Sequence, residues 1–206
     1  MMKTVDARDR DCPAPVLMAR EAVEAGKPQT FCVIVNNDAA RQNVCRFLKS
    51  MGYAVSEETQ DEAVHITGVR HEDNQDAAEV SPVRSGLPAA EESGQRRIML
   101  MITTDRMGYG DDTLGQKLMI NFIRTAGEFG ADLWRLVFVN SGVKLAIDTS
   151  EVVDTLRQYE AQNVTILVCG TCLEHYGLTA RKRVGETTNM LDIVTAMHLA
   201  DKAIVL

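Results

Sequence analysis

The stretch VDARDRDCPAPV, residues 5–16, carries the chain from a strand into a helix through a cysteine followed by two prolines. Its first residues alternate apolar with charged side chains, as in a short half-buried strand. Pro13 has the fixed φ angle that suits a first helical turn. The pattern predicts a helix over residues 13–25, because glycine and proline stop signals follow it. Cys12 is therefore expected at or just before the N-terminus of this helix.

Outward from this stretch, residues 1–70 have the pattern of one small α/β domain. Strands are expected at 3–7, 30–35, 53–57 and 64–68, and helices at 13–25 and 39–51. The resulting order is β-α-β-α-β-β. Such an order predicts a two-layer domain in which both helices cover one face of the sheet.

Residues 96–206 have the pattern of a second α/β domain. Strands are expected at 97–103, 134–139, 164–169 and 202–206, and helices from 112 onward, at 150–162 and at 190–200. This alternation predicts a mainly parallel sheet with helices on both faces. Between the domains, residues 71–95 hold six acidic and one basic side chain and few large apolar residues. That composition predicts a flexible acidic linker.

The composition of the 206 residues excludes several classes of protein. A net charge of −7 argues against a general nucleic-acid binder, which would carry a basic patch. No apolar run approaches the roughly 20 residues of a membrane helix, and the N-terminus has no secretory pattern. Five cysteines, an odd number, are read as thiols rather than disulfides. These features predict a cytoplasmic protein.

The position of Cys12 favours a reactive thiol. A helix N-terminus has unpaired N–H groups and a partial positive charge, which stabilise a thiolate, the nucleophilic form of cysteine. Pro13 and Pro15 stiffen the turn, so the sulfur is expected to project outward on a rigid base. The alternative interpretation is a small buried cysteine beside prolines that only mark the start of a helix.

The first domain resembles the TusA family of sulfur carriers. The resemblance rests on the β-α-β-α-β-β order and on Val5-Asp6-Ala7-Arg8, Asp11-Cys12-Pro13-Ala14-Pro15 and Val16. It implies that Cys12 accepts sulfur as a persulfide and passes it on, without a metal or organic cofactor. One position departs from the family, which usually has glycine where this chain has Asp9. The carboxylate of Asp9 is expected to disfavour the thiolate.

A Cys-x-x-Cys sequence, Cys169 to Cys172, follows the apolar strand at 164–169. It is expected at the C-terminal edge of the parallel sheet, where ligands bind in such folds. Dithiol redox chemistry, metal binding and sulfur relay all need two close sulfurs, and Gly170 is expected to provide the tight turn between them. Metal binding is the weakest of these alternatives, because His175 is the only other soft ligand nearby. A structural role for one or both cysteines stays open.

The loop at 105–112 lies after the first strand of the second domain, at the same sheet edge. It lacks the spacings of phosphate-binding loops and dinucleotide fingerprints. Asp111 or Asp112 is expected to cap the next helix, while Gly108 and Gly110 allow the backbone to approach a neighbouring site closely.

The second domain resembles the DsrE-like domain of the YedF family, which joins a TusA-like domain to a DsrE-like one. The motifs that carry this resemblance are the loop just described with Leu114-Gly115, Asn140-Ser141-Gly142-Val143-Lys144, and Val168-Cys169-Gly170-Thr171-Cys172-Leu173. The YedF family is associated with selenium metabolism, and only this resemblance introduces selenium.

These observations predict a sulfurtransferase-like carrier of sulfur or selenium rather than an enzyme with many turnovers on a small substrate. Cys12 would accept the chalcogen, and Cys169 or Cys172 would receive, resolve or stabilise it. The expected partners are a cysteine desulfurase or other donor protein, an acceptor protein and a second copy of the chain bound through the C-terminal domain. No nucleic acid and no membrane is expected. The alternatives are a regulatory protein with redox-sensing cysteines and a dithiol oxidoreductase using Cys169 and Cys172.

Overall fold

The computed structural model describes residues 3–26, 28–60, 62–70 and 96–206. The chain divides into two compact units, Met1–Glu91 and Glu92–Leu206, which are described separately below. The linker expected at 71–95 lies outside the described residues.

The first unit contains the elements that the sequence predicts, in the predicted order. Strand β1 precedes α1, β2 precedes α2, and β3 and β4 form a hairpin. Their bounds are β1 Lys3–Asp6, α1 Ala14–Glu24, β2 Thr30–Val35, α2 Asp38–Ser50, β3 Ala54–Gln60 and β4 Ala63–Val69. The sheet order is β1-β2-β4-β3, with β1 parallel to β2 and β4 antiparallel to both of its neighbours.

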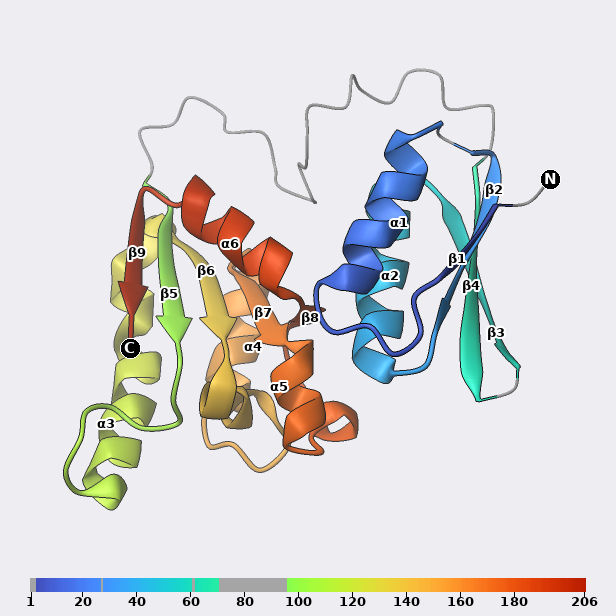
Figure 1. Cartoon of the computed structure of the whole chain (residues 1–206). Helices are drawn as coiled ribbons and strands as arrows, with labels where there is room; N and C mark the ends of the chain where they lie inside the picture. Colours follow the sequence, from blue (N-terminus) through green and yellow to red (C-terminus); the bar gives the residue numbers. More distant parts are fainter. Residues whose placement is uncertain (1–2, 27, 61, 71–95) are drawn as a thin grey trace. The chain divides into compact units, whose positions relative to one another are not determined.

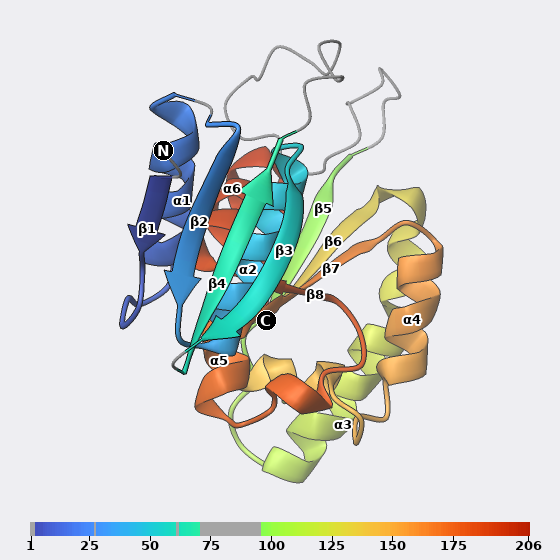
Figure 2. The same ribbon diagram turned by 90° about the vertical axis from the view of Figure 1, so that its right-hand side faces the viewer.

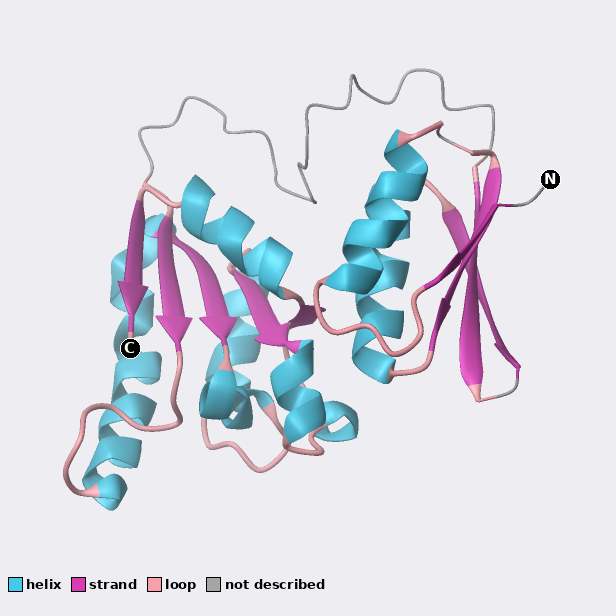
Figure 3. Ribbon diagram, viewed as in Figure 1, coloured by secondary structure: helices cyan, strands magenta, loops and turns pink. Residues whose placement is uncertain are grey.

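Both helices of this unit lie on one face of the sheet, which gives two layers (Figures 1 and 3). Alternate residues of β2 explain this arrangement, since Phe31, Val33 and Val35 are fully buried against the helices. Helix α2 contributes Val44 and Leu48, four residues apart, to the same core. The two-layer prediction is confirmed.

The second unit is built on a sheet of five parallel strands in the order β8-β7-β6-β5-β9. The strands are β5 Ile98–Ile102, β6 Leu133–Phe138, β7 Thr165–Cys169, β8 Glu186–Thr188 and β9 Lys202–Val205. The α-helices are α3 Asp112–Thr125, α4 Val153–Ala161, α5 Gly170–His175 and α6 Met190–Leu199. Short 3-10 helices lie at η1 Ala126–Asp132, η2 Asn140–Ala146 and η3 Thr179–Arg181.

Helices cover both faces of this sheet, as predicted (Figure 2). One face packs Leu100, Leu136 and Ile166 in the cluster that also holds residues of α3 and α4. The opposite face packs Val137 and Ile193 together, and Ile193 belongs to α6. Because β5, β6 and β7 are parallel neighbours, their C-terminal ends lie at the same edge of the sheet, where α5 and η2 begin.

Among the strands and α-helices of this unit, β8 and α5 were not predicted, nor were the three short 3-10 helices. Strand β8 has three residues, Glu-Thr-Thr, and presents no apolar run. Helix α5 has six residues and follows β7 directly, without loop residues between them. Within the described residues, none of the helices has the length and apolarity needed to cross a membrane.

Candidate functional site

Cys12 is exposed in the turn that leads into α1. The helix begins at Ala14, with Pro13 at the N-cap position. The N–H of Ala14 donates to the carbonyl oxygen of Asp11 (2.8 Å), Pro15 has no N–H, and the next two residues both donate to the Pro13 carbonyl (3.1 Å each). The expectation that unpaired N–H groups face the sulfur is therefore wrong, because the turn satisfies them internally. Cys12 is therefore exposed on a turn that backbone hydrogen bonds stabilise.

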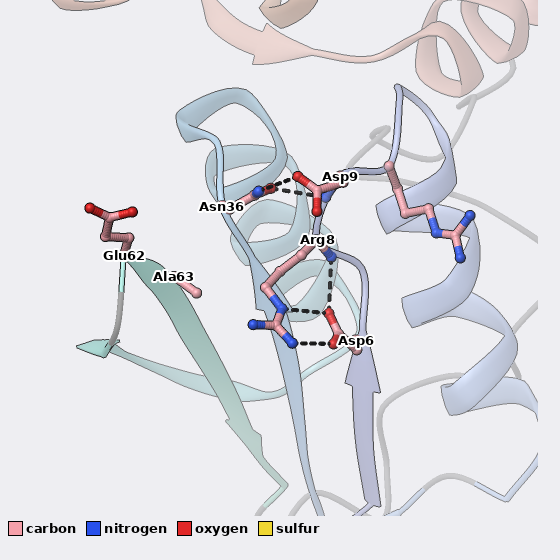
Figure 4. Close-up of a pocket in the computed structure, with 7 residues that line it drawn as sticks. Asp6, Arg8, Asp9, Asn36, Glu62 and Ala63 are labelled. Carbon is pink, nitrogen blue, oxygen red and sulfur yellow. Dashed lines mark hydrogen bonds and ion pairs between the residues drawn. The ribbon is translucent and has the colours of Figure 1, made fainter.

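Asp9 occupies the position where the family usually has glycine, and it adopts a left-handed φ of 55°. Glycine reaches this conformation without steric cost, and aspartate is among the side chains that tolerate it best. Asn36 holds Asp9 through two hydrogen bonds: the Asp9 N–H donates to Asn36 Oδ1 (3.1 Å), and Asn36 Nδ2 donates to Asp9 Oδ1 (2.7 Å) (Figure 4). The carboxylate is thus engaged at the end of β2.

A polar cavity of about 550 Å³ lies beside this loop (Figure 4). Arg8 crosses it and binds Asp6 through Nε (3.0 Å) and Nη2 (2.6 Å). These hydrogen bonds from Arg8 lower the pKa of the Asp6 carboxyl to about 2. The lining residues are Asp6, Arg8, Asp9, Arg10, Asn36, Glu62 and Ala63. Cys12 does not line the cavity, although it shares the loop between β1 and α1 with Arg10.

In the second unit, Cys169 and Cys172 lie close together at the C-terminal end of β7. Cys169 is the last residue of the strand and is 5% exposed, while Cys172 lies three residues later in α5 and is partly exposed. One helical turn brings their side chains to the same side. The expectation that Gly170 provides a tight turn is wrong: Gly170 is the first residue of α5, and its φ is not positive.

Cys172 is in an environment that favours the thiolate. The Cys169 thiol hydrogen bonds to its sulfur, and the backbone N–H of Asn140 donates to Cys172 Sγ over 3.1 Å. Together with the nearby charge of His175, these interactions outweigh burial and lower the pKa of Cys172 to about 6. At neutral pH the thiolate is therefore the main form.

Two of the other cysteines, Cys32 and Cys45, have raised rather than lowered pKa values. Burial raises the pKa of Cys32 above its ordinary value. Burial and the Glu57 carboxylate raise the pKa of Cys45 to about 12. Both are buried, and both stay protonated at neutral pH. Buried, protonated cysteines of this kind pack as small apolar side chains.

Polar side chains connect Asn140, whose backbone N–H contacts Cys172, to neighbouring elements. The Tyr176 hydroxyl donates to Asn140 Oδ1 (2.9 Å), and Lys144 Nζ lies 5.0 Å from the centre of the Tyr176 ring. Asp105 accepts from the Ser141 hydroxyl (3.2 Å) and lies 3.7 Å from Lys144 Nζ. Residues from α5, from η2 and from the loop after β5 thus meet at the sheet edge.

The loop at 105–112 has the predicted helix cap. Asp111 accepts a hydrogen bond from the N–H of Leu114 (2.7 Å) and caps α3. Gly108 and Gly110 have φ angles of 78° and 143°, which only glycine adopts readily. The expectation of a close backbone approach at these glycines is wrong, because a Cβ atom at either position would have no atom within 4 Å apart from its own residue and chain neighbours. The loop instead contributes Asp105, which contacts Ser141 and Lys144. Among the residues that the structure describes, three or more His, Cys, Asp or Glu side chains are nowhere grouped to hold a metal ion.

The family of the chain follows from a comparison with family sequence models. The model of the DsrE/DsrF-like family matches residues 99–206. The chain belongs to the DsrE/DsrF-like family. In this DsrE-like chain, residues 3–70 match the model of sulfurtransferase TusA. The predicted fusion of a TusA-like domain to a DsrE-like domain, as in YedF, is therefore confirmed.

Two of the solved structures with similarity to this DsrE-like chain are the following. A SirA-like protein from Desulfitobacterium hafniense is 32% identical, covering 33% of this chain and 96% of that protein, with a TM-score of 0.31. The YchN protein from E. coli is 16% identical, covering 54% of this chain and 99% of that protein, with a TM-score of 0.42. The search of curated proteins finds no match.

Sequence reasoning on this DsrE-like chain missed Asn36 and Tyr176. Asn36 follows β2 and meets Asp9 across 27 positions, and Tyr176 meets Asn140 across 36 positions. No local periodicity links such pairs. The one available signal was the substitution at Asp9, because a residue that replaces a left-handed glycine needs a partner to hold it.

Proposed function

We propose that this chain is a carrier of sulfur, or of selenium in the same chemical role, in which Cys12 accepts the atom as a persulfide. The observation that carries the proposal is the exposed Cys12 at the Cys-Pro-Ala-Pro turn of a domain that matches the TusA model. Exposure lets a donor protein reach the sulfur. The hydrogen bonds of the turn hold the Cys12 sulfur at a fixed position relative to α1.

The first step is thiol exchange with a donor persulfide. The Cys12 thiolate attacks the terminal sulfur of the donor, so a new S–S bond forms to Cys12 and the donor S–S bond breaks. The donor cysteine leaves as a thiolate, and the proton stays on the transferred sulfur. The expected donor is a cysteine desulfurase or a related donor protein.

Cys172 is the second carrier in this proposal. Its thiolate attacks the terminal sulfur of the Cys12 persulfide, which returns Cys12 to the thiolate form. The lowered pKa of Cys172 supports this assignment over Cys169, because Cys169 is buried and donates the hydrogen bond. An acceptor protein then takes the sulfur from Cys172 by the same exchange.

The motif residues have supporting roles in the proposal. Asp11 closes the turn before α1, and Pro13 and Pro15 stiffen it. In the second unit Asp111 caps α3, which follows the loop of Gly108 and Gly110. Free thiols at all five cysteines fit a reducing compartment, so we place the protein in the cytoplasm.

Self-association through the C-terminal domain is also part of the proposal. Met190, Val194 and Met197 are exposed and recur along one face of α6. Solvent-exposed apolar rows of this kind are typical of contact surfaces. Light scattering of the wild type and of Val194→Asp tests this: a single monomeric mass for the wild type would contradict it.

Intact-protein mass spectrometry tests the role of Cys12. The wild type, Cys12→Ser and the matched control Cys32→Ser are incubated with a cysteine desulfurase and cysteine. The wild type and Cys32→Ser are expected to gain one sulfur that a thiol reductant removes, and Cys12→Ser is expected to gain none. An undiminished adduct on Cys12→Ser would overturn the proposal. Repeating the incubation with a selenocysteine lyase and selenocysteine tests selenium.

A dithiol oxidoreductase is the second candidate, favoured by the hydrogen bond between the Cys169 and Cys172 side chains. In this reaction the pair is oxidised to a disulfide while a substrate disulfide is reduced to two thiols. Disulfide reduction that survives Cys12→Ser and is lost in both Cys169→Ser and Cys172→Ser would establish it.

A further inference from the structure

The Cys172 sulfur accepts a hydrogen bond from a backbone N–H that lies outside α5. Asn140 is the first residue of η2, directly after β6 and Val139, and it adopts a left-handed φ of 49°. In this conformation its N–H donates to Cys172 Sγ over 3.1 Å. Asparagine tolerates this left-handed conformation better than most residues other than glycine, and the contacts around it select this conformation.

The turn is held by the backbone hydrogen bonds from Val139 N–H to Ile102 O and from Gly142 N–H to Val139 O (3.0 Å each), and by contacts on two sides. On one side, Gly142 lies so close to the end of β5 that a Cβ atom there would be 2.3 Å from the carbonyl oxygen of Ile102. On the other side, the Tyr176 hydroxyl donates to the side-chain oxygen of Asn140 over 2.9 Å. Tyr176 is the residue directly after α5, and the last turn of this helix carries it. The element that bears the thiol therefore also bears the group that holds its hydrogen-bond donor.

We infer that Tyr176 is a positioning residue for the Cys172 nucleophile: by holding the Asn140 side chain, it keeps the Asn140 N–H aimed at the sulfur. The inference rests on the proposed function in that it concerns the thiol assigned there as the second carrier. It adds a residue that does not touch the sulfur itself. A charged acceptor gains more from an aimed N–H than a neutral one, so the contact favours the thiolate over the thiol.

Other groups also face this sulfur from the elements packed around it. They are Cys169 at the end of β7 and His175 on α5. Lys144 on η2 lies over the Tyr176 ring and near Asp105. Arg181 on η3 is engaged by Asp148. Tyr176→Phe leaves all of them in place, and it retains the ring on which Lys144 rests. The substitution removes only the hydroxyl that reaches Asn140.

The test is the alkylation rate of Cys172 in the full-length chain, read on the Cys172 peptide by mass spectrometry with iodoacetamide as the probe. Because only the thiolate reacts, the rate at about pH 5.5 reports ionisation, and the rate at about pH 9 reports access. Tyr176→Phe is expected to slow the reaction roughly fivefold at the lower pH, a typical effect of weakening one hydrogen bond to a charged group. At the higher pH the rates are expected to be equal.

Asn140→Gly is the second variant, because glycine keeps the backbone N–H and the positive φ but removes the oxygen that Tyr176 contacts. It is expected to show the same fall at low pH, and the double variant is expected to show no further fall, since both changes remove one interaction. An unchanged rate in Tyr176→Phe, an equal fall at both pH values, or additive effects in the double variant would each overturn the inference. Sulfur donors are not used, so the result is independent of whether Cys12 carries sulfur.

Discussion

Replacing Cys169 by alanine removes the largest contribution to the lowered pKa of Cys172. That pKa lies at about 6 instead of the ordinary 9.0, which corresponds to roughly a thousandfold in the ionisation constant. A hydrogen bond to a charged group contributes about 1.5–3 kcal/mol, so losing the Cys169 donor lowers the ionisation constant by about ten- to hundredfold. The thiolate population would then be lost below about pH 7 to 8 rather than below about pH 6.

The assay is the pH profile of Cys172 alkylation, followed by peptide mass spectrometry in the full-length chain. Cys169→Ser is the matched control, because a serine hydroxyl also donates a hydrogen bond. The profile of Cys169→Ala is expected to move to higher pH, and that of Cys169→Ser is expected to stay closer to the wild type. If all three proteins share one profile, the Cys169 thiol is not what stabilises the thiolate, and the reasoning is refuted.

Substitutions at three further positions test the account by independent routes. Asp9→Ala loses the hydrogen bond that Asn36 Nδ2 donates to the carboxylate, although the backbone N–H can still donate to Asn36 Oδ1. Because alanine also keeps the unfavourable φ, the free energy of unfolding in urea should fall by about 1–2 kcal/mol. Asp9→Gly should lose less of the free energy of unfolding than Asp9→Ala, because glycine adopts this φ without strain. A larger loss in Asp9→Gly than in Asp9→Ala would contradict the strain argument. Gly142→Ala meets the backbone of Ile102 and should lower the melting temperature, corresponding to about 1–3 kcal/mol; an unchanged melting temperature would count against the close approach. Cys45→Ala should leave sulfur loading unchanged, because Cys45 is buried and protonated; reduced loading would show that it takes part.

Much of the fold was predictable because burial imposes a pattern on the sequence. The continuous apolar run Thr30–Val35 predicts β2, and Val44 and Leu48 recur at helical spacing along α2. Strand β8 escaped prediction because its Glu-Thr-Thr sequence is held by pairing with β7 rather than by its own apolar side chains. Strand β8 therefore forms because it pairs with β7 at the edge of the sheet, and its own sequence does not indicate a strand.

The sequence predicts which cysteines form the candidate site, but it does not predict the residues that contact them. The Cys-x-x-Cys spacing locates Cys169 and Cys172 at the end of a strand, but the first turn of α5, and not a tight turn at Gly170, brings them together. Which of the two is the thiolate depends on the Asn140 N–H, which comes from a residue 32 positions away. Contacts of this length follow from the parallel order of β6 and β7, which single-segment patterns do not contain.

The central claim is that sulfur enters on Cys12 and continues to Cys172. Site-resolved persulfide mapping tests it most directly: the chain is loaded by a cysteine desulfurase with cysteine, samples are trapped over time, and the two cysteine peptides are quantified by mass spectrometry. The account predicts an adduct on Cys12 first and on Cys172 later, with neither adduct in Cys12→Ser. Sulfur reaching Cys172 in Cys12→Ser at the wild-type rate would contradict the account.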